Sequence, residues 1–314
     1  MAGPQTENRT DGQAGLFDWM IFAIVLFAGG ASFAFIRGAV ETIPPAIVTI
    51  GRLWIGALFL CAVMIHAGRK FPPLFVSIDG KYSVHQEWKW IIGISMIGYV
   101  VPFFIFPWAQ QHIESGLAGV YMGFMPIWTV LFAYFFANET LGRNKIIGLM
   151  MGVIGLIVLL GPEVLNGIAQ SDFIAQCLVL LATVCYGIHA VLTRRAPPIR
   201  PRIFAAGTIL SAAIMSTPVL FLTPIEIDQW SVASIANLIA LGLCSTGLVA
   251  LLLIIIIQRV GAGFTGFVNY LTPVWAVILG ALLFNERLEF SVLVALVIIL
   301  IGVAVSRRRE KPGH

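Results

Sequence analysis

The side chains of this sequence that could do chemistry are polar and aromatic residues that interrupt long apolar runs. Arg52 is the one cation well inside such a run, and a guanidinium can hold a carboxylate through two parallel hydrogen bonds. Tyrosine and asparagine can bind the polar ends of a small solute, while aromatic rings enclose its body. The candidate binding residues are Ser32, Arg52, Tyr99, Tyr121, Tyr186, His189, Ser245, Thr246, Asn269 and Tyr270.

Each of these candidates also has a purely structural interpretation, because polar side chains commonly join helices inside membrane bundles. Arg52 could hold a substrate carboxylate, pair with Glu41 or Glu114, or bond the carbonyl groups of a helix end. His189 could take part in proton coupling or simply pack between helices. Both interpretations stay open from the sequence.

The sequence lacks the motifs of an intramembrane enzyme. Neither H-E-x-x-H nor G-x-S-x-G occurs, and no nucleophile is placed with a matching base. The cysteines lie inside apolar runs, where they pack as small apolar residues; they are Cys61, Cys177, Cys185 and Cys244. We therefore expect no catalytic residue, disulfide, metal site or cofactor.

The elements that must position the candidate residues are membrane-spanning helices. Apolar residues make up 59% of the chain, charged residues 11%, and the mean hydropathy is +0.95. Residues 146–160 and 238–257 are apolar on every face, which favours helices over the alternating strands of a barrel. The net charge of +4 requires no nucleic-acid partner.

Breaks at glycine, proline and charged residues divide the chain into ten candidate spans of membrane-crossing length. The predicted spans cover about residues 17–37, 46–66, 88–108, 115–137, 145–161, 172–193, 202–222, 234–257, 261–284 and 289–306. Residues 1–16 are predicted to form a disordered cytoplasmic tail, and residues 307–314 a basic cytoplasmic tail. This predicts an all-α integral membrane protein.

The distribution of cations supports this count and orients the spans. With a cytoplasmic N-terminus, sixteen of the nineteen Lys and Arg residues fall on the cytoplasmic side. Only Arg37 and Arg287 face outward, and Arg52 lies within a span. The sorting predicts an even number of spans, both termini in the cytoplasm, and a place in the inner membrane.

The chain also contains an internal repeat. Residues 111–158 match residues 258–305 without a gap, and thirteen of the forty-eight pairs are identical. Pro126/Pro273 and Trp128/Trp275 are among them, so the match extends beyond common apolar types. We predict two five-helix repeats, residues 17–161 and 162–306. Since five is odd, the second repeat is inverted, as in alternating-access transporters.

The most specific parts of this repeat resemble the drug/metabolite transporter superfamily, EamA type, over essentially the whole chain. The segments are Pro126-Ile127-Trp128 to Asn138-Glu139-Thr140-Leu141, and Pro273-Val274-Trp275 to Asn285-Glu286-Arg287-Leu288. Arg52 resembles the arginine that such proteins carry in their second helix. The resemblance implies a carrier of amino acids, other metabolites or drugs, with a central cavity lined by helices 1, 3, 4, 6, 8 and 9.

Structural and gating roles are predicted for a second group of residues. Pro126 and Pro273 remove backbone donors and would kink helices that gate a pathway, although such kinks can be static. Glu139 and Glu286 follow asparagines at helix ends, where they can cap the free N–H groups of the next helix. Glycine-rich helix faces allow close packing and could also pair two protomers into a homodimer.

Together these features predict a secondary transporter of small polar metabolites, amino acids or related solutes above all, in the direction of export. Its partners would be the small-molecule substrate and the lipid bilayer, without nucleic acid. A flippase for lipid-linked substrates and a scaffold or receptor that transports nothing remain alternatives. A scaffold has no reason to keep two inverted halves or polar residues at the membrane midplane.

Overall fold

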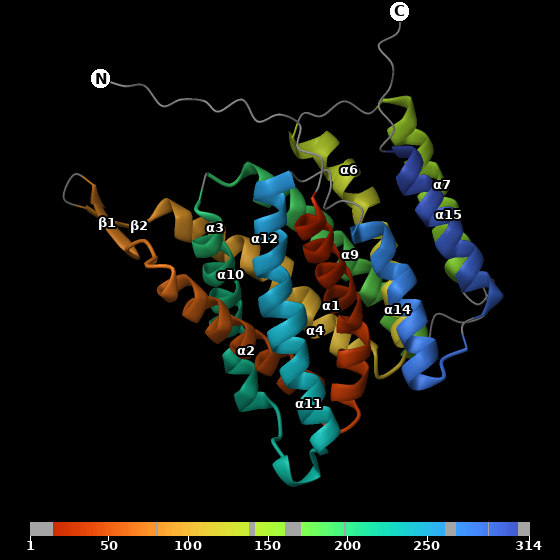
Figure 1. Cartoon of the computed structure of the whole chain (residues 1–314), viewed down its shortest axis with the longest axis horizontal. Coiled ribbons are helices and arrows are strands. Elements are labelled where there is room, and N and C mark those ends of the chain that lie inside the picture. Colours follow the sequence, from red (N-terminus) through yellow and green to blue (C-terminus); the bar gives the residue numbers. More distant parts are fainter. Residues whose placement is uncertain are drawn as a thin grey trace, which may run out of the picture.

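The computed structural model describes residues 15–78, 81–137, 142–160, 171–197, 199–260, 268–287 and 289–306. Over these ranges the chain forms a bundle of helices that run roughly alongside one another, with one short hairpin at its edge (Figure 1). The helical prediction is therefore confirmed, and the hairpin is an addition that the sequence pattern did not indicate.

The described elements follow one another in chain order, with short π-helical and 3₁₀ segments continuing several helices. Up to residue 160 they are α1 (Leu16–Val40), α2 (Pro45–His66), β1 (Phe75–Ile78), β2 (Lys81–Val84), α3 (Gln86–Ser95), η1 (Met96–Val100), α4 (Val101–Ala109), α5 (Ser115–Tyr121), η2 (Met122–Phe124), α6 (Met125–Ala137) and α7 (Arg143–Leu160). The later elements are α9 (Ser171–Arg195), α10 (Pro201–Ser216), η3 (Thr217–Leu222), η4 (Ile227–Gln229), α11 (Val232–Ala240), η5 (Leu241–Leu248), α12 (Val249–Val260), α14 (Val268–Phe284) and α15 (Phe290–Ser306).

Seven continuous helical segments among the described residues are long and apolar enough to cross a membrane. They are Leu16–Val40, Pro45–His66, Gln86–Ala109, Ser115–Phe136, Asp172–Thr193, Pro201–Leu222 and Val232–Leu253. Two shorter apolar helices, Leu271–Phe284 and Phe290–Val305, lie near the C-terminal end. The chain is thus a multi-pass membrane protein.

Local sequence explains where several helices begin and end. Pro45 and Pro201 occupy the first turns of α2 and α10, where proline's fixed φ suits a helix and its missing N–H costs nothing. Gly68 follows α2 with a φ of 66°, which glycine adopts without strain. Asn285 takes the same left-handed conformation after α14, with a φ of 53°.

Helices distant in the sequence pack in matching pairs: α1 on α14, and α6 on α9. A Cβ on Gly30 of α1 would lie 2.6 Å from Trp275 Cδ1, and one on Gly187 of α9 would lie 2.5 Å from Trp128 Cβ. Each contact requires a glycine, because any side chain would separate the two helices. The two repeat-related tryptophans are therefore seated in the same way.

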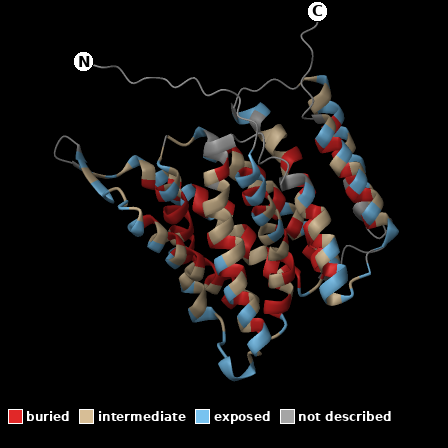
Figure 2. Ribbon diagram, in the orientation of Figure 1, coloured by how far each residue is buried: buried red, intermediate tan, exposed pale blue. Residues whose placement is uncertain are grey.

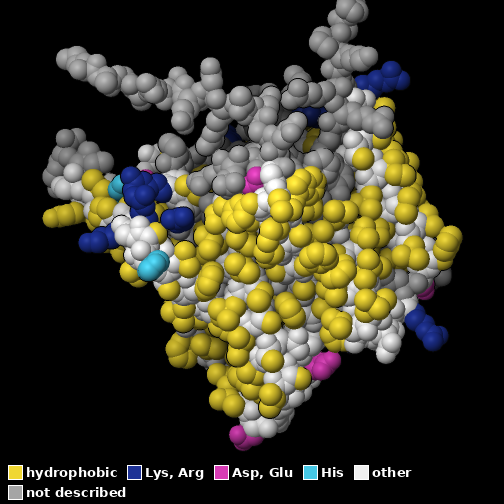
Figure 3. Space-filling view, in the orientation of Figure 1, with side chains coloured by type: hydrophobic (Ala, Val, Ile, Leu, Met, Phe, Trp, Pro, Cys, Tyr) yellow, Lys and Arg dark blue, Asp and Glu magenta, His cyan; other side chains and the backbone are white. Residues whose placement is uncertain are grey.

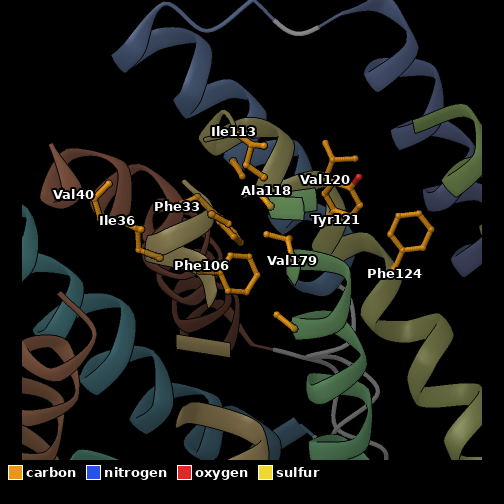
Figure 4. Close-up of a cluster of buried hydrophobic side chains, with 14 of the residues drawn as sticks. Phe33, Ile36, Val40, Phe106, Ile113, Ala118, Val120, Tyr121, Phe124 and Val179 are labelled. Atoms are coloured by element: carbon orange, nitrogen blue, oxygen red, sulfur yellow. The ribbon is translucent and has the colours of Figure 1, made fainter. Parts of the chain in front are cut away.

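The core lies where these helices meet. Its largest cluster of buried side chains joins α1, α4, α5, α9 and α15, and includes Phe33, Phe106 and Tyr121 (Figure 4). Buried residues follow the inner sides of the helices, while exposed residues follow their outer sides and the loops (Figure 2). A second cluster packs α2 and α4 against α10, with Leu53 and Ile209 completely buried.

The outer surface of the bundle is itself apolar. A broad band of hydrophobic side chains covers the face in view, and charged side chains gather at its ends (Figure 3). Exposed residues of this kind include Phe135, Ile157 and Leu282. In water such a surface would drive aggregation, whereas it is the expected boundary of a helical bundle with lipid.

Candidate functional site

Arg52 lies inside the bundle on the third turn of α2, and only 4% of its surface is exposed. Its Nε donates a hydrogen bond to Thr246 Oγ1 at 3.2 Å, and its Nη2 donates to Ser32 Oγ at 3.5 Å. The guanidinium carbon lies 3.8 Å from the centre of the Phe103 ring. Arg52 thus has hydroxyl and aromatic neighbours on three other elements.

Arg52 makes no ion pair with a carboxylate within the described part of the chain. Glu114, one of the partners considered from the sequence, interacts instead with Arg37 and Glu286. A buried cation held only by neutral groups is energetically costly, so this guanidinium can still accept an anionic ligand.

An aromatic wall lies beside the guanidinium. The Tyr99 ring centre is 5.6 Å from that of Phe103 and 5.4 Å from that of His189, both in edge-to-face geometry. Tyr186 of α9 stacks on Phe106 at 6.2 Å and interacts electrostatically with Arg52 and Tyr99. We call Ser32, Arg52, Tyr99, Phe103, Tyr186, His189 and Thr246 the arginine cluster.

Two π-helical segments position this cluster. Tyr99 lies in η1 and Thr246 in η5, and these residues are separated by the same 147 positions as the internal repeat. A π-turn inserts an extra residue, which rotates the following side chains around the helix, and such turns are frequent at functional sites. Thr246 Oγ1 donates to Leu241 O at 3.0 Å, five residues back, so its lone pairs can face Arg52.

Two of the candidate residues lie outside the arginine cluster. The Tyr121 hydroxyl donates to Gln176 Oε1 at 2.8 Å, and its ring is fully buried in the core (Figure 4). Ser245 Oγ donates to Ala28 O at 2.6 Å and joins η5 to α1. Both residues bond neighbouring helices, which fits the structural interpretation of such side chains.

Other candidates fall wholly or partly beyond what the structure describes. Glu139 and the side chains of Asn269 and Tyr270 lie outside the described residues. Pro126 is buried in the first turn of α6, directly after the 3₁₀ turn η2. Pro273 is buried inside α14 and faces Gly123 of η2. The two prolines thus lie close to one irregular helix junction.

Glu286 is a helix cap, but for a different helix than expected. Its Oε1 accepts hydrogen bonds from Ser115 N at 2.8 Å and Ser115 Oγ at 2.7 Å, and its Oε2 accepts from Gly116 N at 2.8 Å. The sequence predicted capping of the following helix. The left-handed turn at Asn285 instead directs the carboxylate back across α14 to the start of α5.

Glu286 borders a polar pocket of about 430 Å³ at this end of the bundle, next to the α5 N-terminus. The pocket is lined by Arg37, Glu41, Gln111, His112, Ile113, Glu114, Phe284, Asn285 and Glu286. Burial and the nearby Glu286 raise the pKa of the Glu114 carboxyl, and Arg37 partly opposes this shift. Arg37 Nη1 also donates to Gln110 O at 2.6 Å.

Sequence reasoning missed Phe103 and the polar pocket. Phe103 looked like ordinary core because nothing in an apolar run distinguishes a ring that meets a cation from one that meets another ring. The Gln110 side chain is fully buried, and its amide has no hydrogen-bond partner among the described residues. Its position beside the predicted helix end gave no sign of burial.

Known proteins resemble this chain over nearly its full length. The uncharacterized transporter YoaV of Bacillus subtilis is 25% identical over 87% of this chain and 91% of its own. The uncharacterized inner membrane transporter YedA of Escherichia coli K12 is 23% identical over 91% and 88%. A solved crystal structure aligns with a TM-score of 0.64 at 20% identity, covering 93% of this chain and 96% of that chain, so the fold is shared.

The fold, the apolar surface and these relatives define a multi-pass membrane transporter. The sequence pattern of the EamA-like transporter family matches residues 17–161 and again residues 173–308. The chain therefore belongs to the EamA-like transporter family, which confirms the resemblance found in its two N-E-x-L segments.

Proposed function

We propose that this chain is a secondary transporter that exports small solutes carrying a carboxylate, amino acids or related metabolites, across the inner membrane. The arginine cluster is the solute site, and Arg52 binds the carboxylate. The observation that carries this proposal is a guanidinium that is 4% exposed, has no ion-pair partner among the described residues, and lies beside an aromatic wall. The planar guanidinium of Arg52, with its fork of N–H donors, suits a carboxylate, and the aromatic rings suit an apolar side chain of the solute.

The mechanism is alternating access between two inverted five-helix repeats, residues 17–161 and 162–306, with ten spans in all. Matching contacts support this arrangement. Arg52 lies seven residues after Pro45 of α2 and bonds Thr246 of η5. Thr208 lies seven residues after Pro201 of α10, and its side chain lies near Tyr99 of η1. Thus η5 contacts position 52 of α2, and η1 contacts position 208 of α10, which are equivalent positions of the two repeats. Only the first of these positions is charged.

Several hydrogen bonds close the end of the bundle that we assign to the outer side. Besides the Glu286 cap, Ser231 N donates to Thr42 Oγ1 at 3.0 Å, and Ser234 Oγ donates to Gly38 O at 2.8 Å. All of them join the first repeat to the second. They support a state that is shut outward, with both termini in the cytoplasm as the cation distribution predicts. Outward opening requires breaking them.

Counterflow in proteoliposomes tests the proposal. Proteoliposomes that contain the purified protein and are loaded with unlabelled amino acids should accumulate the labelled forms. The methyl esters of the same amino acids should fail to compete. The esters keep the amine and side chain and lose only the carboxylate charge. No exchange across a broad amino-acid and carboxylate panel, or equal competition by the esters, would contradict the assigned substrate class.

Arg52→Gln separates a binding role from a structural one. Because truncating one partner of a buried charge pair costs about 2 kcal/mol or more, solute affinity should fall at least about 30-fold. Arg52→Lys, the matched control, keeps the charge and should retain part of the affinity. The melting temperature without solute should hold or rise, since an uncompensated buried cation is removed. A large loss of stability with unchanged affinity would make Arg52 structural.

A further inference from the structure

The hairpin between α2 and α3 extends sideways from the bundle, beyond the end of α2 at His66 (Figure 1). An isolated two-stranded hairpin is marginally stable in water, so packing must hold this one in place. Trp88 Nε1 donates to Pro72 O at 3.1 Å, the Phe71 and Trp88 ring centres lie 5.7 Å apart, and His85 N donates to Leu74 O at 2.9 Å. The hairpin is thus fixed to the start of α3.

One face of this hairpin is apolar and uncovered. Phe75 pairs with Val84 and Ser77 with Tyr82, so all four side chains point to the same side of the sheet. The exposed fractions are 62% for Phe75, 83% for Tyr82 and 39% for Val84. These side chains follow a membrane-spanning helix and precede another, so the medium that meets them is the boundary between lipid and water.

Cations gather next to this face. Lys70 precedes Phe71 and Lys89 follows Trp88, so the Phe71–Trp88 ring contact brings the two lysines to one region, with Arg69 beside them. All three are exposed. Figure 3 shows Lys, Arg and His side chains collected at the hairpin end of the molecule. The acid in this region that the structure describes is Glu87, which is half-buried.

A hollow of about 520 Å³ lies beside the hairpin at the start of α3, and Lys89 is the cation that lines it. Val76, Val84 and Trp90 supply apolar walls, and its polar lining is Ser83, His85, Gln86 and Lys89. Hydrogen-bond donors and a cation next to apolar walls match a phosphate group joined to acyl chains. A soluble anion would leave the apolar wall and the exposed hairpin face unused.

We infer that the hairpin and the first turn of α3 form a seat for an anionic phospholipid. Lys70 and Lys89 hold the phosphate, Arg69 adds to the positive field, and the acyl chains cover Phe75, Tyr82 and Val84. Charge complementarity favours an anionic over a zwitterionic headgroup, and each basic residue near a membrane surface strengthens such binding about five-fold. The inference does not depend on the solute that the chain carries.

Native mass spectrometry of the full chain, released from detergent after titration with phosphatidylglycerol or phosphatidylcholine, tests this seat. Phosphatidylglycerol should bind at least ten-fold more tightly. Lys70→Gln with Lys89→Gln should weaken its binding about 25-fold, as expected for two cations. Phe75→Ser with Tyr82→Ser should also weaken it, although the charges remain.

The matched control is Arg143→Gln with Lys145→Gln in α7, which removes two cations from the opposite edge of the bundle (Figure 1). This control should bind phosphatidylglycerol as tightly as the native chain does. Lys70→Arg with Lys89→Arg keeps both charges and should restore the phosphatidylglycerol affinity that the glutamine variant loses. Equal affinity for both lipids, displacement by inorganic phosphate, or unchanged binding in the two test variants would overturn the inference. The inference would also be overturned if the chain formed a dimer that dissociates when Phe75 and Tyr82 are replaced.

Discussion

At the scale of single residues, the polar pocket holds a carboxyl group whose ionisation the fold opposes. Glu114 is partly buried and lies close to the Glu286 carboxylate, and both effects raise the pKa of Glu114 above its ordinary value of 4.5. Arg37 lowers the pKa of Glu114, but it offsets only part of this rise. A group whose pKa is raised by folding favours the folded state while it is protonated, and this contribution is lost as the pH rises through the folded-state pKa.

Glu114→Gln mimics the protonated carboxyl and should therefore change the pH dependence of stability. The difference in melting temperature, variant minus native, should be more positive at pH 7 than at pH 4. Thermal unfolding in detergent at both pH values measures it, with Glu41→Gln, from the same pocket, as the control. A difference that does not change with pH would mean that Glu286 and burial do not disfavour the Glu114 charge.

At the scale of elements, the structure joins helix ends that are far apart in the sequence. The α5 N-terminus would otherwise leave the Ser115 and Gly116 N–H groups without partners, and the Glu286 carboxylate satisfies both. The position of that carboxylate depends on the turn at Asn285, a residue type that tolerates the left-handed conformation. A local turn in one half thereby stabilises a helix in the other.

Glu286→Ala should destabilise the protein by about 1–2 kcal/mol, the usual effect of losing a helix cap. It should also speed hydrogen exchange of the Ser115 and Gly116 amides, because the loss is local to that helix end. Glu289→Ala is the control, since this exposed carboxylate bonds only Ser291 within the described residues. Equal effects of the two variants would show that the cap contributes no more than an ordinary surface acid.

At the scale of the whole molecule, the proposed transport cycle requires the two repeats to separate at the closed end. Thr42 follows α1 and Ser231 precedes α11, and their side-chain oxygens lie 3.5 Å apart. The pair joins the two repeats at a place where a crosslink would resist outward opening without touching the arginine cluster.

Thr42→Cys with Ser231→Cys, oxidised to the disulfide, should abolish counterflow and leave solute binding within about two-fold of the reduced protein. Reduction should restore transport, and each single cysteine variant should be insensitive to the oxidant. Undiminished exchange by the fully crosslinked protein would exclude opening at this end as a step of transport.

The amount that the sequence could predict differs between the fold and the site. Apolar runs and cation sorting indicate helices and a membrane because lipid excludes unpaired backbone and charge, whatever the tertiary packing. Among the site residues, Ser32, Arg52, Tyr99, Tyr186 and His189 do lie together. Tyr121 and Ser245 had the same sequence character, yet they bond neighbouring helices elsewhere.

The sequence by itself determined that the chain is helical and crosses a membrane, since hydrophobicity and backbone satisfaction act locally along each helix. It also determined the family, through the two repeated N-E-x-L segments. Only the tertiary structure decided the partners: Arg52 with Thr246 and Phe103, and Glu286 with α5. The physical reason is that these contacts depend on how helices are rotated and paired, and one π-turn such as η1 or η5 changes that rotation without altering the apolar pattern.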